Sequence, residues 1–84
     1  MRYRYVLDCA VAESIFGLSG RQRDLFIRFF RALADDPFQV GDETFLDSTG
    51  REIQKKRFAR WLVSYWPDHA VKEVRIVGVQ LATR

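Results

Sequence analysis

The residues of this chain best suited to chemistry are cations that lie close together between positions 51 and 60. Positive side chains that converge on one phosphate make charge-assisted hydrogen bonds to its oxygens. The cluster therefore indicates a surface for an anionic partner. Its members are Arg51, Lys55, Lys56, Arg57 and Arg60, and Arg84 is a further candidate.

This segment has the composition of a strand, and strand alternation divides its cations between two faces. Lys55 and Arg57 share one face with Ile53, whereas Lys56 shares the other face with Phe58. Two interpretations stay open at this point. The cations bind phosphate, or they guard an edge strand against pairing with another chain.

The remaining reactive side chains give weaker signals. His69, the one histidine, can exchange a proton near neutral pH. It lies in the run Trp66-Pro67-Asp68-His69-Ala70, which is typical of an exposed turn, so a surface role is favoured over catalysis. Cys9 has no partner for a disulfide, which fits a reducing compartment, and we expect it to be a small buried hydrophobe.

Several site classes are excluded by the absence of their motifs. The chain has no glycine-rich phosphate loop, no metal-ligand spacing and no Ser or Cys nucleophile paired with a histidine. We therefore predict no metal and no cofactor.

Composition predicts one folded domain over residues 1–84. The chain is 48% hydrophobic and 14% aromatic, which favours an ordered globule over a disordered segment. Its net charge of +3 permits an anionic partner without requiring one. No signal peptide or membrane-spanning run is present, so we expect a cytoplasmic protein without a membrane partner.

The pattern of elements predicts an α+β fold. Residues 3–7 read as a strand, 10–18 and 21–35 as helices, and 51–58, 61–66 and 71–81 as three strands, with a further short strand at 44–46. Short connections between the last three strands imply antiparallel neighbours. Tyr65 and Trp66 must then point to opposite faces, one into the core and one toward a stacking ligand or a partner.

The helix expected at 21–35 has an apolar arc wider than one sheet face can cover. This width predicts contact with both the preceding helix and the sheet, as a helical hairpin packed on one face. Ser19 can cap the helix, and its opposite stripe of mixed charges is typical of a solvated, ion-paired surface.

Four segments together resemble the RelE/ParE superfamily, the small basic toxins of bacterial type II toxin–antitoxin systems, which include plasmid stabilisation proteins. They are the opening Tyr-Arg-Tyr-Val-Leu strand, the helix ending Leu-Ala-Asp-Asp-Pro, the Ala-Arg-Trp-Leu-Val-Ser-Tyr hairpin and the closing Glu-Val-Arg-Ile-Val-Gly-Val strand. The resemblance implies a β-α-α-β-β-β order and an antitoxin partner. Some members cleave mRNA on the ribosome, and others inhibit DNA gyrase without a nuclease site.

The resemblance also implies which residues would act. Metal-independent RNA cleavage needs proton transfer and stabilisation of the charge on the phosphate. Lys55, Arg57 and Arg60 are the candidate catalytic residues of such an endoribonuclease. The candidate RNA-binding or partner-binding residues are Arg51, Lys56, Trp61, Tyr65 and Arg84.

Two departures from the nuclease pattern weaken this assignment. Leu62 and Gln80 stand where nuclease members commonly carry basic residues, and no terminal Tyr or His supplies a proton. Whether the chain is an enzyme is therefore left open by its sequence. A ParE-like gyrase inhibitor without catalysis and a degenerate, non-toxic member are the alternatives.

Overall fold

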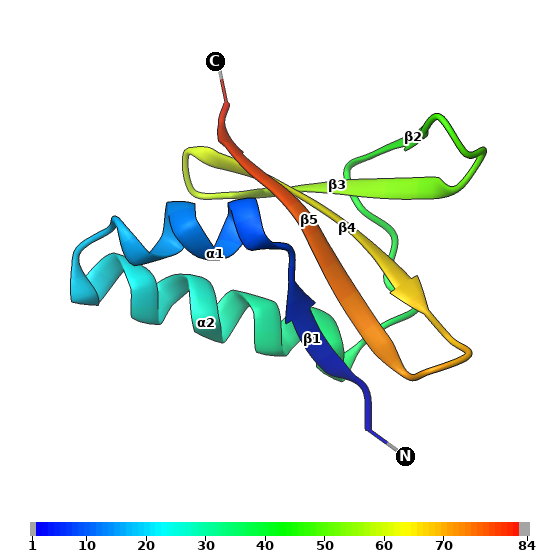
Figure 1. Cartoon of the computed structure of the whole chain (residues 1–84), viewed down its shortest axis with the longest axis horizontal. Coiled ribbons are helices and arrows are strands. Elements are labelled where there is room, and N and C mark those ends of the chain that lie inside the picture. Colours follow the sequence, from blue (N-terminus) through cyan, green and yellow to red (C-terminus); the bar gives the residue numbers. More distant parts are fainter. Residues whose placement is uncertain (1, 83–84) are drawn as a thin grey trace.

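The computed structural model describes residues 2–82, and Arg84 lies outside this range. Two helices pack on one face of a sheet of five strands (Figure 1). The elements are β1 (Arg4–Leu7), α1 (Cys9–Phe16), α2 (Gly20–Asp35), β2 (Glu43–Leu46), β3 (Glu52–Phe58), β4 (Trp61–Asp68) and β5 (Glu73–Leu81). The predicted α+β class and the helical hairpin on one face are confirmed.

The strand order is β1-β5-β4-β3-β2. The predicted antiparallel pairing of β3, β4 and β5 is confirmed, and β1 joins the far side of β5 in parallel. The four-residue strand β2 pairs with β3 and forms the edge. Because β3 pairs with β2 along one edge and with β4 along the other, it is not an edge strand. The interpretation of its cations as guards of an edge strand is therefore wrong.

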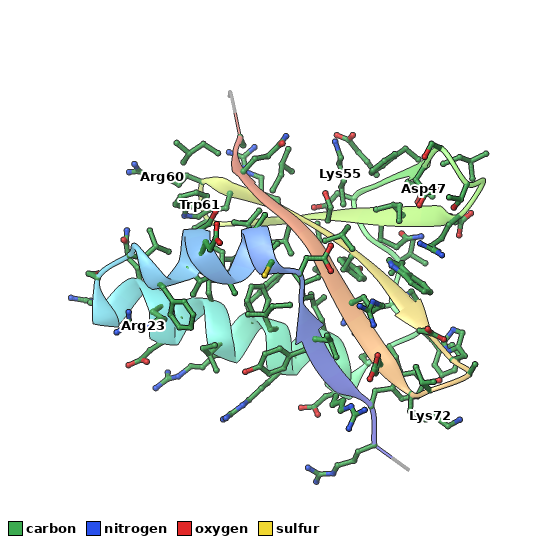
Figure 2. All side chains as sticks on the ribbon, viewed as in Figure 1. Arg23, Asp47, Lys55, Arg60, Trp61 and Lys72 are labelled. Carbon is green, nitrogen blue, oxygen red and sulfur yellow. The ribbon has the colours of Figure 1, made fainter. Side chains whose placement is uncertain are left out.

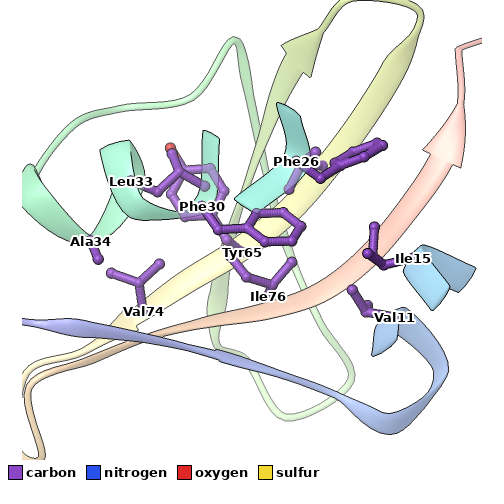
Figure 3. Close-up of a cluster of buried hydrophobic side chains, with 10 residues drawn as sticks. Val11, Ile15, Phe26, Phe30, Leu33, Ala34, Tyr65, Val74 and Ile76 are labelled. Atoms are coloured by element: carbon purple, nitrogen blue, oxygen red, sulfur yellow. The ribbon is translucent and has the colours of Figure 1, made fainter. Parts of the chain in front are cut away.

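The core lies between the helices and the β1, β5 and β4 part of the sheet (Figure 3). Phe26 and Phe30 of α2 are buried against Val63 and Tyr65 of β4, and α1 contributes Val11 and Ile15. The rings make edge contacts, such as 5.4 Å between the centroids of Phe26 and Trp61. Large rings thus fill a core that is small for lack of chain length.

The N-terminus of α2 is capped by a side chain, whereas the N-terminus of α1 is not. The Ser19 hydroxyl accepts a hydrogen bond from the Gln22 amide at 3.2 Å, which confirms it as the cap of α2. Asp8 occupies the same position before α1, but its side chain makes no capping bond. Cys9 begins α1 with its side chain exposed, so the expectation of a buried cysteine is wrong.

The loop between α2 and β2 covers β3 on the helical side of the sheet. Gly41 passes so close that an added Cβ would lie 2.6 Å from the Lys55 carbonyl oxygen, and no other residue fits there. The Gln54 side chain accepts from the Gly41 amide at 2.8 Å and fixes this approach. The loop leaves the opposite face of the sheet uncovered.

Candidate open-face binding site

The candidate site is the sheet face opposite the helices, which we call the open face. Val63 and Tyr65 point into the core, so alternation sends Leu62, Ser64 and Trp66 to the open face. The pairing register then extends this face across the neighbouring strands. It brings together Lys55 opposite Ser64, Arg57 opposite Leu62, Gln80 opposite Leu62, Gly78 opposite Ser64 and Arg75 opposite Trp66.

Arg51 and Trp66 form the aromatic end of this face. The guanidinium carbon of Arg51 lies 4.0 Å from the centre of the Trp66 ring, a cation–π contact. Arg51 also lies 3.6 Å from a carboxylate oxygen of Asp47. Hydrogen bonds from the Thr49 hydroxyl and the Arg51 amide lower the pKa of Asp47, so this pair stays charged near neutral pH.

Lys55 and Arg57 are held in different ways. The Lys55 ammonium lies 4.9 Å from the centre of the Phe45 ring on the edge strand β2. The Arg57 side chain folds toward the β3–β4 turn, where its Nε donates to the Ala59 carbonyl at 3.1 Å. Both residues lie on the open face, as alternation predicted.

A charge cluster completes the open face at β5 and β1. Glu73 accepts from Arg4 Nη2 at 2.8 Å and from Arg75 Nη1 at 3.0 Å, and only 12% of its side chain is exposed. The hydrogen bond from Arg4, opposed by burial, and the two positive charges lower the pKa of Glu73. This carboxylate neutralises much of the positive charge of Arg4 and Arg75.

The structure separates the residues that the sequence grouped together. Lys56 points to the helical side, where its Nζ donates to the Gln39 side-chain oxygen at 2.6 Å. Arg60 and Trp61 lie at the β3–β4 turn, at one end of the sheet and away from Lys55 (Figure 2). Trp61 packs against Phe26 in the core, so it belongs to a different surface. Of the three candidate catalytic residues, only Lys55 and Arg57 share a face.

Tyr65 is not an exposed contact residue. Its side chain is 1% exposed, and its ring fills the centre of the core (Figure 3). Trp66, the residue next to Tyr65, lies on the open face instead. The sequence carried a signal for this, because Tyr65 is two residues after the apolar Val63 and therefore shares its face. Phe45, Arg4 and Arg75 were missed because only the register brings them to this face.

Leu62 and Gln80 lie directly opposite each other on the open face. They occupy the space beside Arg57 with an apolar and a neutral side chain, so the positive charge stops at β3 in this part of the sheet.

Within residues 2–82, no group of three His, Cys, Asp or Glu side chains could hold a metal ion. The described helices also include none long and apolar enough to cross a membrane.

The fold is shared with solved toxin–antitoxin complexes. A chain of the archaeal RelE–RelB complex from Pyrococcus horikoshii OT3 aligns with a TM-score of 0.78 and 17% identity, covering 100% of this chain and 99% of that chain. This chain has the RelE-like fold. A chain of the RelBE2 complex from Mycobacterium tuberculosis aligns with a TM-score of 0.77 and 17% identity, covering 96% and 99%. No protein-family model and no curated protein matches the sequence.

Proposed function

We propose that this protein is the toxin-like component of a toxin–antitoxin pair and that its open face binds mRNA on the ribosome in the cytoplasm. The observation that supports this most directly is the alignment of Arg51, Lys55 and Arg57 on an uncovered sheet face beside an aromatic ring. Cations that follow a strand bind a nucleic-acid backbone, and a base would stack on the Trp66 ring in place of the Arg51 guanidinium that lies over it. The RelE-like fold, matched over the whole chain by a chain of the RelE–RelB complex, supports the same role.

Cleavage of the bound strand would rest on Lys55 and Arg57. Both can place positive charge next to a phosphate and stabilise the additional negative charge that develops as a 2′-hydroxyl attacks it. Arg60 lies in the β3–β4 turn, toward which the Arg57 side chain folds, and away from Lys55, so it is left out of this pair. No metal or cofactor enters this scheme, and any proton transfer would be left to the RNA or to the ribosome.

A cognate antitoxin would neutralise the open face. The charge of that face suits an acidic, amphipathic segment, so a short neighbouring reading frame encoding such a segment is expected. Co-expression should yield a complex whose stability falls with added salt, because screening weakens exposed ion pairs. A neighbouring protein that fails to bind, or that binds equally well to a Lys55→Ala/Arg57→Ala variant, would contradict this part of the proposal.

The deciding experiment is expression without the antitoxin, followed by mapping of mRNA ends. We expect growth arrest with new ends inside codons of translated messages. Lys55→Ala/Arg57→Ala should relieve the arrest, whereas Arg28→Ala/Arg31→Ala, which removes two exposed cations from α2, should not. Arrest that persists in the first variant would remove the open face from the mechanism.

A second candidate function is favoured by Leu62 and Gln80. Their neutral pair interrupts the positive charge beside Arg57, which suits a protein target better than a phosphate backbone. The ParE-like alternative is a gyrase inhibitor without catalysis. Altered plasmid supercoiling with intact mRNA after induction would favour it, and growth without either effect would indicate a non-toxic member of the fold.

A further inference from the structure

A second cluster of aromatic side chains lies at the opposite end of the sheet from Arg60. Its members come from three distant segments: Tyr3 precedes β1, Phe38 follows α2, and His69 lies in the β4–β5 turn. The Tyr3 hydroxyl is 2.5 Å from His69 Nδ1. The Phe38 ring stacks on the His69 ring, with 4.8 Å between centroids and 11° between planes. His69 therefore lies in an exposed turn, and contacts with Tyr3 and Phe38 hold its ring in place.

A cavity of about 530 Å³ opens beside this cluster. Small-ligand sites commonly have volumes of roughly 300 to 1,000 Å³, so this cavity has the volume of a small-ligand site. Phe38 is 73% exposed although its ring is already stacked on one side, which leaves ring surface available to a planar ligand. The cavity is lined mainly by Arg2, Tyr3, Asp35, Asp36, Pro37 and Phe38.

The backbone near the cluster is held in place at some cost. Lys72 has a φ of 59°, a left-handed conformation that is unfavourable for a residue other than glycine. Its carbonyl accepts from the Arg4 amide at 3.1 Å, and its ammonium lies 5.5 Å from the centre of the Tyr3 ring. Glycine would relieve the strain but would remove this positive charge from the aromatic cluster.

We propose that this cavity, which we call the aromatic cavity, binds a guanine nucleotide. The base would stack on Phe38, as bases do on exposed aromatic side chains. A carboxylate of Asp35 or Asp36 would accept the two adjacent N–H groups of the guanine edge. Arg2 lines the same cavity and would hold the phosphate.

The mixed charge of the lining favours a nucleotide over a basic peptide. Asp35 and Asp36 would attract a Lys or Arg side chain from a protein partner, but Arg2 and the nearby Lys72 would repel it. A nucleotide carries both a donor edge for the carboxylates and an anion for Arg2. The aromatic cavity lies between the α2 end and Tyr3, not on the open face, so this inference does not depend on the proposed function.

The test is a titration of the whole protein with GMP, AMP, CMP and UMP. NMR spectra monitor binding through the ring resonances of Tyr3, Phe38 and His69. We expect saturable shifts in all three rings, with GMP binding most tightly. Phe38→Ala should weaken GMP binding about 10-fold, the loss typical of one stacked base. Phe16→Ala is the matched control, because Phe16 is also 73% exposed but lies at the far end of α1.

Two further variants separate recognition from folding. Asp35→Asn and Asp36→Asn keep the size of each side chain, and one of them should abolish the preference for GMP over AMP while leaving the thermal unfolding midpoint unchanged. Phe38→Leu keeps apolar contact with His69 but loses the stacking ring, so it should weaken binding as Phe38→Ala does. Binding retained by Phe38→Leu would overturn the stacking role.

Other outcomes would overturn the proposal as a whole. Absence of shifts with all four nucleotides at millimolar concentration would exclude a nucleotide site. Shifts produced by an Arg-rich peptide and not by GMP would identify the aromatic cavity as a contact for a basic protein segment. Equal binding of all four nucleotides, unaffected by Asp35→Asn or Asp36→Asn, would contradict recognition of guanine.

Discussion

The two faces of the sheet are built from the same strands but differ in burial. On the helical side, Val63, Tyr65 and Ile76 are almost fully buried beneath the rings of α2. On the open face, neighbouring positions of the same strands carry Ser64, Trp66 and Arg75, which stay partly exposed. The helical face therefore buries most of the core, whereas the open face buries Ile53 and leaves these other positions available for a partner. Substitutions can be chosen to test whether this division is as sharp as it looks.

The largest effect is expected from matched phenylalanines on the two sides. Phe30 is 0% exposed, and Phe30→Ala should lower the free energy of unfolding by about 3–5 kcal/mol. Phe45 is 41% exposed on the edge strand, and Phe45→Ala should cost less than about 1 kcal/mol. Urea denaturation measures both. Equal costs would mean that the open face also holds the fold together.

A smaller effect of opposite sign is expected at Tyr65. Its buried hydroxyl has no hydrogen-bond partner among the described residues. Tyr65→Phe removes that unsatisfied group and should raise the free energy of unfolding by about 1 kcal/mol at neutral pH. A loss of stability instead would show that the hydroxyl has a partner, such as a buried water.

The same residue should give the protein a specific alkaline sensitivity. Burial, with the negative charges of Asp42 and Asp36, raises the pKa of Tyr65 above 10.0. The unfolded chain then loses this proton at lower pH than the folded one, so stability should fall as the pH rises above about 10. Denaturation between neutral and alkaline pH should show this fall in the native protein and a smaller one in Tyr65→Phe.

The open face can be tested by adding the charge that it lacks. Leu62→Arg places a cation between Arg57 and Gln80 and should leave stability nearly unchanged, because Leu62 is outside the core. Each added phosphate contact should steepen the logarithmic salt dependence of single-strand RNA binding by about 0.7. Fluorescence anisotropy at several salt concentrations measures the slope. An unchanged slope would mean that RNA does not pass over this position.

The smallest effect is expected from the charge cluster at Glu73. Its lowered pKa means that the folded state keeps this carboxylate ionised to lower pH than the unfolded chain does. The stability that it contributes is present above pH 4.5 and is lost as the pH falls through the folded pKa. Glu73→Gln should therefore reduce the loss of stability at acidic pH, measured by urea denaturation at several pH values. An unchanged loss would show that Arg4 and Arg75 do not stabilise the carboxylate.

Much of the fold could be predicted because its signals are local. The apolar arc of α2, the Ser19 cap and the short connections after β3 each depend on residues close in the chain. The strand β2 gave only a weak signal, since four exposed residues carry no clear alternation. Its pairing with β3 is a long-range contact, and that contact overturned the interpretation of β3 as an edge strand.

The site was predicted less completely, for a related reason. Alternation shows that Lys55 and Arg57 share a face but does not show where Arg60 lies, because the turn at Ala59 with a φ of 54° breaks the period. It also separates Tyr65 from Trp66 without showing which of them the helices cover. Tyr65 was therefore assigned to partner binding, whereas the structure buries it.

The sequence by itself determined the elements, their order and the division of each strand into two kinds of side chain, because these depend on backbone preference and period. Only the tertiary structure decided which kind faces the helices, which strand forms the edge and which distant residues meet. The contact of Tyr3 with Phe38 and His69 shows the difference most clearly. These residues lie far apart in the chain, and the folding of β1 beside β5 brings them together.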